Sequence, residues 1–383
     1  MTSRPLPAPQ VERCIGRIDP ARPMLLAILM KRTFTVRGSQ AIPAEAAEPF
    51  VVEEQTVPAS TGAELLRRSP EIVPDRDHCD LLVLATARSA VATTRAEVTL
   101  QAPGIARTLV VQGDRTAERT GSNWRFSPPA PWTEMSLGWD RAYGGIDVGV
   151  RPDPARPGDM MRAAMIHPGA YPRNDVGRGF SLAESTLSSD GMPLPNVELP
   201  DDLLTSGRFQ CERRERWHLQ PRPAGFGPVP AHWFPRSLHM GTVAGVWPDP
   251  STALAEESSG LLPPGFLAHQ RAASPDELTI SPGFFQVSAP GLFLPRPRGD
   301  ERIVLQGIDD GRELALDLPG GCPRIALSAP GRTLPLEPRL FQVLWDVDPG
   351  VCTMLWGAGI RVDHPALVSV PEEALMELPV SVT

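Results

Sequence analysis

Residues 340–347 read LFQVLWDV, residues 351–357 read VCTMLWG, and the tripeptide Asp-Pro-Gly joins the two runs. Both runs are largely apolar and have the length of strands. Proline presets φ at the second position of a turn, and glycine accepts the positive φ that a type II turn needs at the third. Period-two alternation places four side chains of the first run on one face: Phe341, Val343, Trp345 and Val347. The pattern therefore predicts two antiparallel strands that bury one face.

The same construction recurs through the last third of the chain. Residues 303–308 (IVLQGI) and 313–318 (ELALDL) flank an Asp-Asp-Gly turn, which is the pattern of a hairpin. Residues 324–329 and 333–337 flank an Ala-Pro-Gly turn in the same way. Pro-Gly turns of this kind occupy residues 102–104, 289–291, 329–331 and 348–350. Each of these turns is expected to connect strands, so the last third of the chain is predicted to be a β-meander.

The proline content argues against long helices. The chain has 45 prolines among 383 residues, more than double the usual share of about 5%. Each proline costs the interior of a helix about 3 kcal/mol. Two apolar runs in the first third, DLLVLATA from residue 80 and RTLVVQG from residue 107, have the length and composition of strands. Short helices are expected at residues 62–68, 251–258 and 372–378.

These patterns predict a mainly β protein with few short helices. Residues 1–135 are expected to form an N-terminal β unit, and residues 276–383 a C-terminal β-meander unit, each a sheet or a sandwich-like body. Residues 136–275 join them as an irregular region rich in glycine, proline and tryptophan, packed on both. Because proline and glycine together stay below the share of about 25 to 30% that suggests disorder, the central region is expected to be ordered by aromatic packing.

The composition is that of a cytoplasmic protein that binds neither nucleic acid nor a membrane. The longest purely apolar run, residues 24–30, has seven residues, whereas a membrane-spanning helix needs about 20. Residues 1–13 lack the apolar segment of a signal peptide. The formal charge of −8 disfavours general nucleic-acid binding, which depends on neutralising phosphates. Residues 208–236 are a local exception, with six arginines against two glutamates. This run is interpreted as a solvated or carboxylate-paired surface, or as a contact for an acidic partner.

Sequence motifs of familiar chemistry are absent. Gly-x-Ser-x-Gly, the phosphate-binding Gly-x-x-x-x-Gly-Lys-Ser/Thr and His-Glu-x-x-His do not occur. The five cysteines and seven histidines have no zinc-binding spacing. His78, Cys79 and Asp80 are consecutive, so on a strand Cys79 points away from both neighbours. We therefore assign no catalytic, cofactor-binding or metal-binding residue, and we expect no cofactor.

The stretch from residue 139 to residue 247 concentrates glycine, proline and large aromatic side chains. Its pieces are WDRAYGGID from residue 139, YPRNDVGRGF from 171, LPNVE from 194, PAGFGPVPAHWFPR from 223 and GTVAGVW from 241. Such a segment has a defined shape without regular secondary structure. It either presents an irregular face with Trp and Arg anchors to a partner or joins the two β units. The candidate residues for either role are Trp139, Asp140, Tyr143, Gly144, Gly145, Asn174, Gly177, Gly179, Phe180, Asn196, Glu198, Gly225, Phe226, Gly227, Trp233, Arg236 and Trp247.

These pieces, together with LLAILMKRTF at residues 25–34 and the strand from residue 80, follow one another in the order of a known family. The chain resembles a bacterial family of uncharacterised domains encoded beside the type VI secretion spike proteins VgrG and PAAR and their toxins. The resemblance implies a non-enzymatic adaptor or chaperone that binds a secreted toxin effector and helps to load it onto the spike. Its partners would then be that effector and VgrG or PAAR. Exposed strand edges of a β-rich scaffold would suit the addition of a partner strand.

Two other functions stay open at this stage. Asp140, Asp147 and Glu198 lie among tryptophans, as carboxylates do in enzymes that cleave sugars, and Asp140 with Asp147 or Glu198 could form the pair of a carbohydrate-active hydrolase. Asp140 could instead accept N–H bonds from the turn at Gly144 and Gly145. The third possibility is an immunity-like protein that binds and inhibits a toxin. The identity of the effector, the surface that binds it, the oligomeric state and direct contact with the spike do not follow from the sequence.

Overall fold

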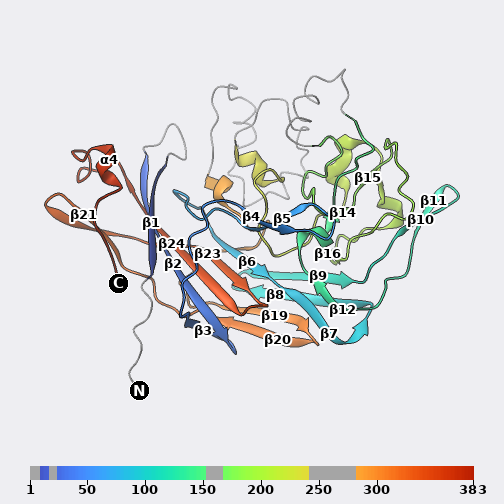
Figure 1. Cartoon of the computed structure of the whole chain (residues 1–383), viewed down its shortest axis with the longest axis horizontal. Helices are drawn as coiled ribbons and strands as arrows, with labels where there is room; N and C mark the ends of the chain where they lie inside the picture. Colours follow the sequence, from blue (N-terminus) through green and yellow to red (C-terminus); the bar gives the residue numbers. More distant parts are fainter. Residues whose placement is uncertain (1–8, 17–23, 152–166, 241–281) are drawn as a thin grey trace.

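A 14-stranded sheet dominates the computed structural model, which describes residues 9–16, 24–151, 167–240 and 282–383 (Figure 1). The expected mainly β class is confirmed. The main order of the sheet is β16-β9-β8-β19-β20-β3-β2-β24-β23-β6-β18, with β1 paired to β2, and β12 reached through β7 beside β19. The bounds of these strands are β1 Gln10–Gly16, β2 Leu25–Arg37, β3 Gln40–Pro43, β6 Cys79–Leu84, β7 Thr86–Thr93, β8 Arg95–Ala102, β9 Ile105–Gln112, β12 Trp132–Ser136, β16 Val197–Glu198, β18 Phe293–Leu294, β19 Arg302–Asp309, β20 Arg312–Asp317, β23 Arg339–Asp346 and β24 Val351–Arg361.

Smaller elements surround this sheet. The short strands are β4 Gln55–Pro58, β5 Glu64–Arg68, β10 Ala117–Thr120, β11 Asn123–Phe126, β13 Tyr143–Gly144, β14 Arg178–Gly179, β15 Ser181–Leu182, β17 Gln210–Cys211, β21 Ile325–Ala329, β22 Arg332–Leu336 and β25 Val380–Val382. The helical turns are η1 Trp139–Arg141, η2 Ser206–Arg208, η3 Arg214–Leu219, η4 Arg236–Met240, η5 Pro282–Phe285 and α4 Glu372–Leu375. Among the described residues no helix is long and apolar enough to cross a membrane.

The centre of the sheet joins strands from opposite ends of the chain. β2 pairs with β24 along its length, from Leu25 opposite Arg361 to Thr35 opposite Val351. On the other side of β24, β23 pairs in parallel with β6. Strands that precede residue 135 therefore alternate with strands that follow residue 276 in one sheet, and the two expected units share their backbone hydrogen bonds.

Most of the expected hairpins are present. β19 and β20 join through Asp310 and Gly311, both at positive φ, and β23 and β24 join through the turn that contains Gly350. The Pro-Gly turns at residues 102–104 and 329–331 connect β8 to β9 and β21 to β22. The turn at residues 289–291 differs, because it follows η5 and leads into β18 instead of joining two paired strands.

The prediction that β23 buries one face through four alternating side chains is wrong in two respects. A β-bulge between Leu340 and Gln342 shifts the register, so Phe341 packs with Leu29 and Leu355 on the face opposite Val343. The strand is also buried on both faces. A bulge inserts one residue into the alternation, and the apolar pattern alone does not reveal it.

The second face of the central strands is covered by the segment between β3 and β6. Phe50 and Ile72 pack against Leu29, Phe341 and Leu355 there. Lys31 of β2 points to the same side and donates to both carboxylate oxygens of Glu71, at 2.9 and 2.7 Å, and to a backbone carbonyl at 2.9 Å. Burial lowers the pKa of Lys31, and the charge of Glu71 partly offsets this effect. A fully buried ion pair therefore attaches the covering segment to the sheet.

The central region has an aromatic core of its own. Two-residue strands and helical turns supply little regular hydrogen bonding among residues 139–151 and 167–240. Tyr143, Tyr171 and Phe180 pack edge to face or tilted, with ring centroids 5.0 to 6.4 Å apart. Trp217 joins the group through Tyr171 and Phe234. The aromatic packing expected from the composition is thus present in the described part of this region.

The short helices agree only in part with the expectation. Residues 372–378 contain α4, which is shorter than expected. Residues 62–68 are not helical, because β5 pairs with β4 across a turn in which Gly62 has a φ of 83°. Hairpin pairing overrides the helix propensity of Glu64, Leu65 and Leu66 there. Residues 251–258 lie outside the described residues.

Candidate functional site

Most of the residues singled out from the sequence are buried. Less than a tenth of the residue surface is exposed at the following candidates: Trp139, Asp140, Tyr143, Asn174, Phe180, Asn196, Glu198, Phe226, Trp233 and Arg236. Gly144, Gly145, Gly177, Gly179, Gly225 and Gly227 are buried as well. Trp247 lies outside the described residues. This burial favours a structural role for the group as a whole over a role as an exposed binding face.

The glycines of the Trp139 and Asn174 segments let two backbone strands approach closely. Gly144 has a φ of 150°, and a Cβ added to it would lie 2.1 Å from the carbonyl oxygen of Asn174. The Asn174 side chain donates to the carbonyls of Trp139 and Tyr143 at 2.8 and 3.1 Å. The N–H of Gly145 donates to the Asn174 carbonyl at 2.8 Å. These bonds fix the backbone that carries Trp139.

The three carboxylates of the hydrolase hypothesis are each held by the chain itself. Asp140 accepts hydrogen bonds from the Ser60 N–H, at 2.9 Å, and from the Ser60 hydroxyl. The expected bonds from the N–H groups of Gly144 and Gly145 are not formed. Asp147 accepts bonds from Gly149, Leu182 and Ser185. None of the three lines the pocket described below.

Glu198 is the third of these carboxylates. It accepts bonds from Arg115 at 2.6 Å, Gln112 at 2.7 Å and the Leu204 N–H at 2.7 Å. Burial raises its pKa, and Arg115 partly opposes that shift. Asn196, two residues earlier, donates to the Gln112 carbonyl at 3.1 Å and to Asp114 at 3.0 Å. Both side chains therefore fasten the central region to β9 and to the loop that follows it.

Cys79 does not form a thiol and imidazole pair with its neighbour. His78 stacks on Phe293, with ring centroids 4.7 Å apart. Burial raises the pKa of the Cys79 thiol well above its ordinary value. Asp80 accepts bonds from Arg76 and from Ser288. Among the described residues no three His, Cys, Asp or Glu side chains are grouped so that they could hold a metal ion.

Arg236 is buried in η4 and not presented to solvent. It donates to the carbonyls of Val229 at 2.6 Å and Phe284 at 2.9 Å, and its guanidinium lies over the Phe284 ring. Burial lowers the pKa of Arg236 to about 10. Burial, with a smaller contribution from Arg236, also lowers the pKa of His239 from 6.5 to about 4.

Acid is expected to destabilise the protein through His239. The unfolded chain takes up a proton near pH 6.5, but folded His239 does so only near pH 4. Stability is therefore lost as the pH falls from about 6.5 to about 4, by roughly 3 kcal/mol at most. The measurement is urea unfolding at several pH values for the protein and for His239→Gln, whose curve should be flatter over this interval. Parallel curves for the two proteins would contradict the expectation.

Trp139 and Trp233 meet edge to face, with ring centroids 5.8 Å apart, at the wall of a partly open pocket. Trp139 donates to the Pro228 carbonyl at 3.0 Å, and Trp233 donates to Asp175 at 2.8 Å. Gly225 leaves space for the Trp139 ring, because a Cβ there would lie 2.9 Å from it. The two candidate tryptophans are thus held by the surrounding turns with their N–H groups satisfied, and both line the pocket.

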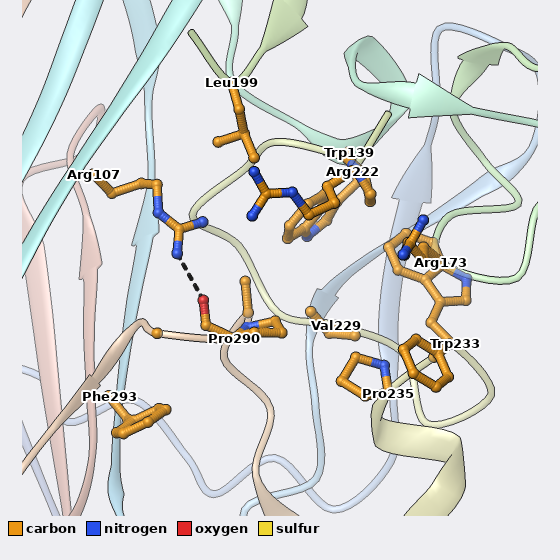
Figure 2. A pocket seen from close by; sticks show the side chains of 14 residues that line it. Arg107, Trp139, Arg173, Leu199, Arg222, Val229, Trp233, Pro235, Pro290 and Phe293 are labelled. Atoms are coloured by element: carbon orange, nitrogen blue, oxygen red, sulfur yellow. Dashed lines mark hydrogen bonds between the residues drawn. The ribbon is translucent and has the colours of Figure 1, made fainter. Parts of the chain in front are cut away.

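The pocket has a volume of about 290 Å³ (Figure 2). Three separate parts of the chain form it: β9, the central region and the turn at residues 289–291. Its lining combines arginine, aromatic, proline and small apolar residues: Arg107, Trp139, Arg173, Leu199, Arg222, Pro223, Val229, Trp233, Phe234, Pro235, Ala289, Pro290, Gly291 and Phe293. Among the residues singled out from the sequence, only Trp139 and Trp233 belong to this described lining.

Three arginines at the pocket were not among the sequence candidates. Arg222 belongs to the arginine-rich run, where Asp201 and Asp202 pair with it at 2.9 and 3.0 Å, as one interpretation of that run expected. Arg173 donates to the Tyr171 hydroxyl at 2.7 Å, with its guanidinium 4.8 Å from the Trp217 ring centroid. Arg107 comes from β9, where nothing in the apolar run marks it.

The family described as an uncharacterised protein conserved in bacteria, DUF2169, matches residues 21–357. The chain belongs to the DUF2169 family. The matched residues include the whole central region and all the described residues that line the pocket. Neither the curated proteins nor the solved structures contain a significant match to it.

Membership of DUF2169 carries no activity with it, because the family's description assigns none. The coarser part of the resemblance stated above, a bacterial family of uncharacterised proteins, is therefore confirmed. Its link to type VI secretion stays a prediction.

Proposed function

We propose that this DUF2169 protein is a cytoplasmic, non-enzymatic adaptor or chaperone that binds a toxin effector and helps to load it onto a type VI secretion spike. The resemblance described from the sequence supplies the biology. The observation that supports a binding role is the pocket beside Trp139 and Trp233, where the partly exposed side chains of Arg107, Arg222 and Phe293 are of the kind that anchors protein interfaces.

The carbohydrate-active alternative finds less support. Hydrolysis needs two carboxyl groups that face one sugar, about 5 to 9.5 Å apart according to mechanism. Asp140, Asp147 and Glu198 are each engaged by donors of the chain, and the pocket lining among the described residues includes three arginines and no carboxylate. A basic pocket of this kind suits an acidic ligand better than the oxocarbenium-like transition state of glycoside cleavage.

The two ends of the main strand order are less suitable than the pocket as a contact for the effector. The strands at the two ends of the main order, β16 and β18, are two residues long. An added strand would find few backbone groups to pair with there. We therefore place the contact at the pocket and not at these two edges.

Binding would protect the effector by mass action. A partner that binds only the folded effector stabilises it by RT ln(1 + [L]/Kd), about 2.7 kcal/mol when the adaptor is present at a hundred times Kd. The adaptor needs no energy source or chemistry for this, only a higher affinity for the unloaded effector than for the assembled spike complex.

Co-expression tests this function. We expect a tagged copy of the full chain to co-purify with the toxin encoded beside it, and deletion of its gene to lower both the solubility and the secretion of that toxin. The control is a second toxin of the same bacterium that is encoded elsewhere. A toxin that is equally soluble and equally secreted without this protein would refute the proposal. Relief of toxicity with unchanged secretion would indicate the immunity-like alternative instead.

A further inference from the structure

One cation at the pocket lacks a counter-ion. Arg107 and Arg222 extend their guanidinium groups toward the same space from two sides (Figure 2). Arg222 forms ion pairs with Asp201 and Asp202. Arg107 donates to the Pro290 carbonyl at 2.8 Å, and within the described part of the chain no carboxylate lies within ion-pair distance of it. The pocket therefore has a surplus of positive charge at Arg107.

The surroundings make this charge unfavourable in the empty pocket. Burial lowers the pKa of Arg107, the nearby Arg222 lowers it further, and Asp201 offsets only part of the effect. A carboxylate placed between the two guanidinium groups would relieve the repulsion between them. The planar fork of arginine matches a carboxylate with two parallel hydrogen bonds, so Arg107 can bind it without giving up the Pro290 carbonyl.

Apart from Arg173, the rest of the lining is apolar. Val229, Trp233 and Pro235 lie across the pocket from Arg107, and Phe293 lies on the Arg107 side, beyond Pro290 (Figure 2). A volume of about 290 Å³ is at the small end of the range of roughly 300 to 1,000 Å³ for ligand pockets. It admits one or two side chains of an extended segment and not a folded element. A free inorganic anion would use Arg107 and leave the apolar wall uncovered.

We propose that this pocket binds an acidic segment of the partner polypeptide, with an Asp or Glu side chain at Arg107 and a neighbouring apolar side chain against Phe293. This inference rests on the proposed function and names the part of the effector that the adaptor holds. The arginine at β9 selects for the carboxylate, and the aromatic wall selects for the apolar neighbour.

The test uses two short peptides that differ in one functional group. N-acetyl-Phe-Asp amide and N-acetyl-Phe-Asn amide are titrated into the full chain labelled with 5-fluorotryptophan, and the fluorine resonances of Trp139 and Trp233 are followed by NMR. We expect the Asp peptide to shift these resonances and to bind at least about tenfold more tightly than the Asn peptide. The Asn peptide lacks the charged hydrogen bond between the carboxylate and Arg107. Inorganic phosphate serves as the third probe and is expected to shift them little.

Variants of the full chain complete the test. Arg107→Gln is expected to bind both peptides equally weakly, and Arg107→Lys to keep part of the preference, because its charge remains and its fork is lost. Arg302→Gln is the matched control, since that arginine is exposed, is paired with Asp317 and does not line the pocket. Its preference should equal that of the unsubstituted protein. Thermal unfolding checks that each variant is folded.

Three results would overturn the inference: equal affinity of the unsubstituted protein for both peptides, a preference that survives in Arg107→Gln, or phosphate binding as tight as that of the Asp peptide. Failure here can be told from failure of the proposed function. If the toxin still co-purifies with Arg107→Gln, the adaptor role stands and the pocket assignment falls. If the peptide preference is found but no toxin co-purifies with the unsubstituted protein, the adaptor role falls and the pocket still binds acidic peptides.

Discussion

Replacement of Lys31 by methionine is expected to lower the free energy of unfolding by about 3 to 5 kcal/mol, because it leaves the Glu71 carboxylate buried without its counter-ion. Lys31 and Glu71 are 1% and 2% exposed, so solvent cannot take over the role of the missing ammonium group. Methionine has nearly the length of the lysine side chain, so the loss of packing is small. Urea unfolding followed by tryptophan fluorescence measures the change.

A second substitution separates the effect of the unpaired Glu71 carboxylate from the other effects of losing the lysine side chain. Glu71 also accepts the Val51 N–H at 2.9 Å, a bond that a glutamine at position 71 can keep. The double variant Lys31→Met with Glu71→Gln removes the charge and retains this acceptor, so it should regain about 1 to 3 kcal/mol relative to Lys31→Met alone. A double variant no more stable than the single one would show that the buried charge is not the cause.

The loss of stability expected for Lys31→Met depends on the burial of the ion pair. An exposed ion pair serves as the comparison. The Nη1 atom of Arg216 lies 2.9 Å from Oε2 of Glu212, and the two side chains are 55% and 77% exposed. Arg216→Met should therefore change stability by less than about 1 kcal/mol. If Arg216→Met costs as much as Lys31→Met, the interpretation of the Lys31 pair as a buried attachment of the covering segment fails.

The sequence predicts the contacts between residues that are near one another along the chain, and it does not predict the contacts between distant residues. The hairpins at Asp310–Gly311 and at Gly350 depend on residues within ten positions of the turn, and they were predicted. The pairing of β2 with β24 joins residues more than 300 positions apart. Both strands are buried on both faces over most of their length, so no local pattern chooses their partner or shows that the two expected units share one sheet. The sequence does not predict the bulge beside Phe341 for the same reason, because apolar residues of β23 occupy both faces of the strand.

The candidate site follows the same rule. Trp139 and Trp233 were found because tryptophan between glycine and proline has a distinct local signature. The pocket they line also needs Arg107 from β9 and the turn before Phe293, which tertiary contacts bring together. Asp140 was expected to bind the turn beside it, yet it bonds to Ser60, 80 positions earlier. A short polar side chain next to a turn has a local partner only when the fold offers nothing better.

The turn at Gly144 should be the most sensitive position of the central region. Gly144→Ala is expected to lower the free energy of unfolding by about 4 kcal/mol, the sum of the strain of a positive φ and the displacement of packed backbone. Its φ is 150°, and the added Cβ would lie 2.1 Å from the Asn174 carbonyl oxygen, a backbone atom that cannot rotate away. Moving that carbonyl breaks its bond from the Gly145 N–H and shifts the Asn174 side chain that holds the Trp139 carbonyl.

Gly121→Ala is the control that separates strain from crowding. Gly121 also has a positive φ, 62°, but nothing lies within 4 Å of a Cβ added to it. Its substitution should cost only about 1 to 2 kcal/mol, the penalty of the left-handed conformation alone. The difference between the two variants in urea unfolding therefore measures the close approach of residues 144 and 174. Because that approach positions Trp139, Gly144→Ala should also weaken binding of N-acetyl-Phe-Asp amide, and Gly121→Ala should not. Equal costs for the two variants would mean that the backbone at Asn174 gives way freely, and that Trp139 is not held by this turn.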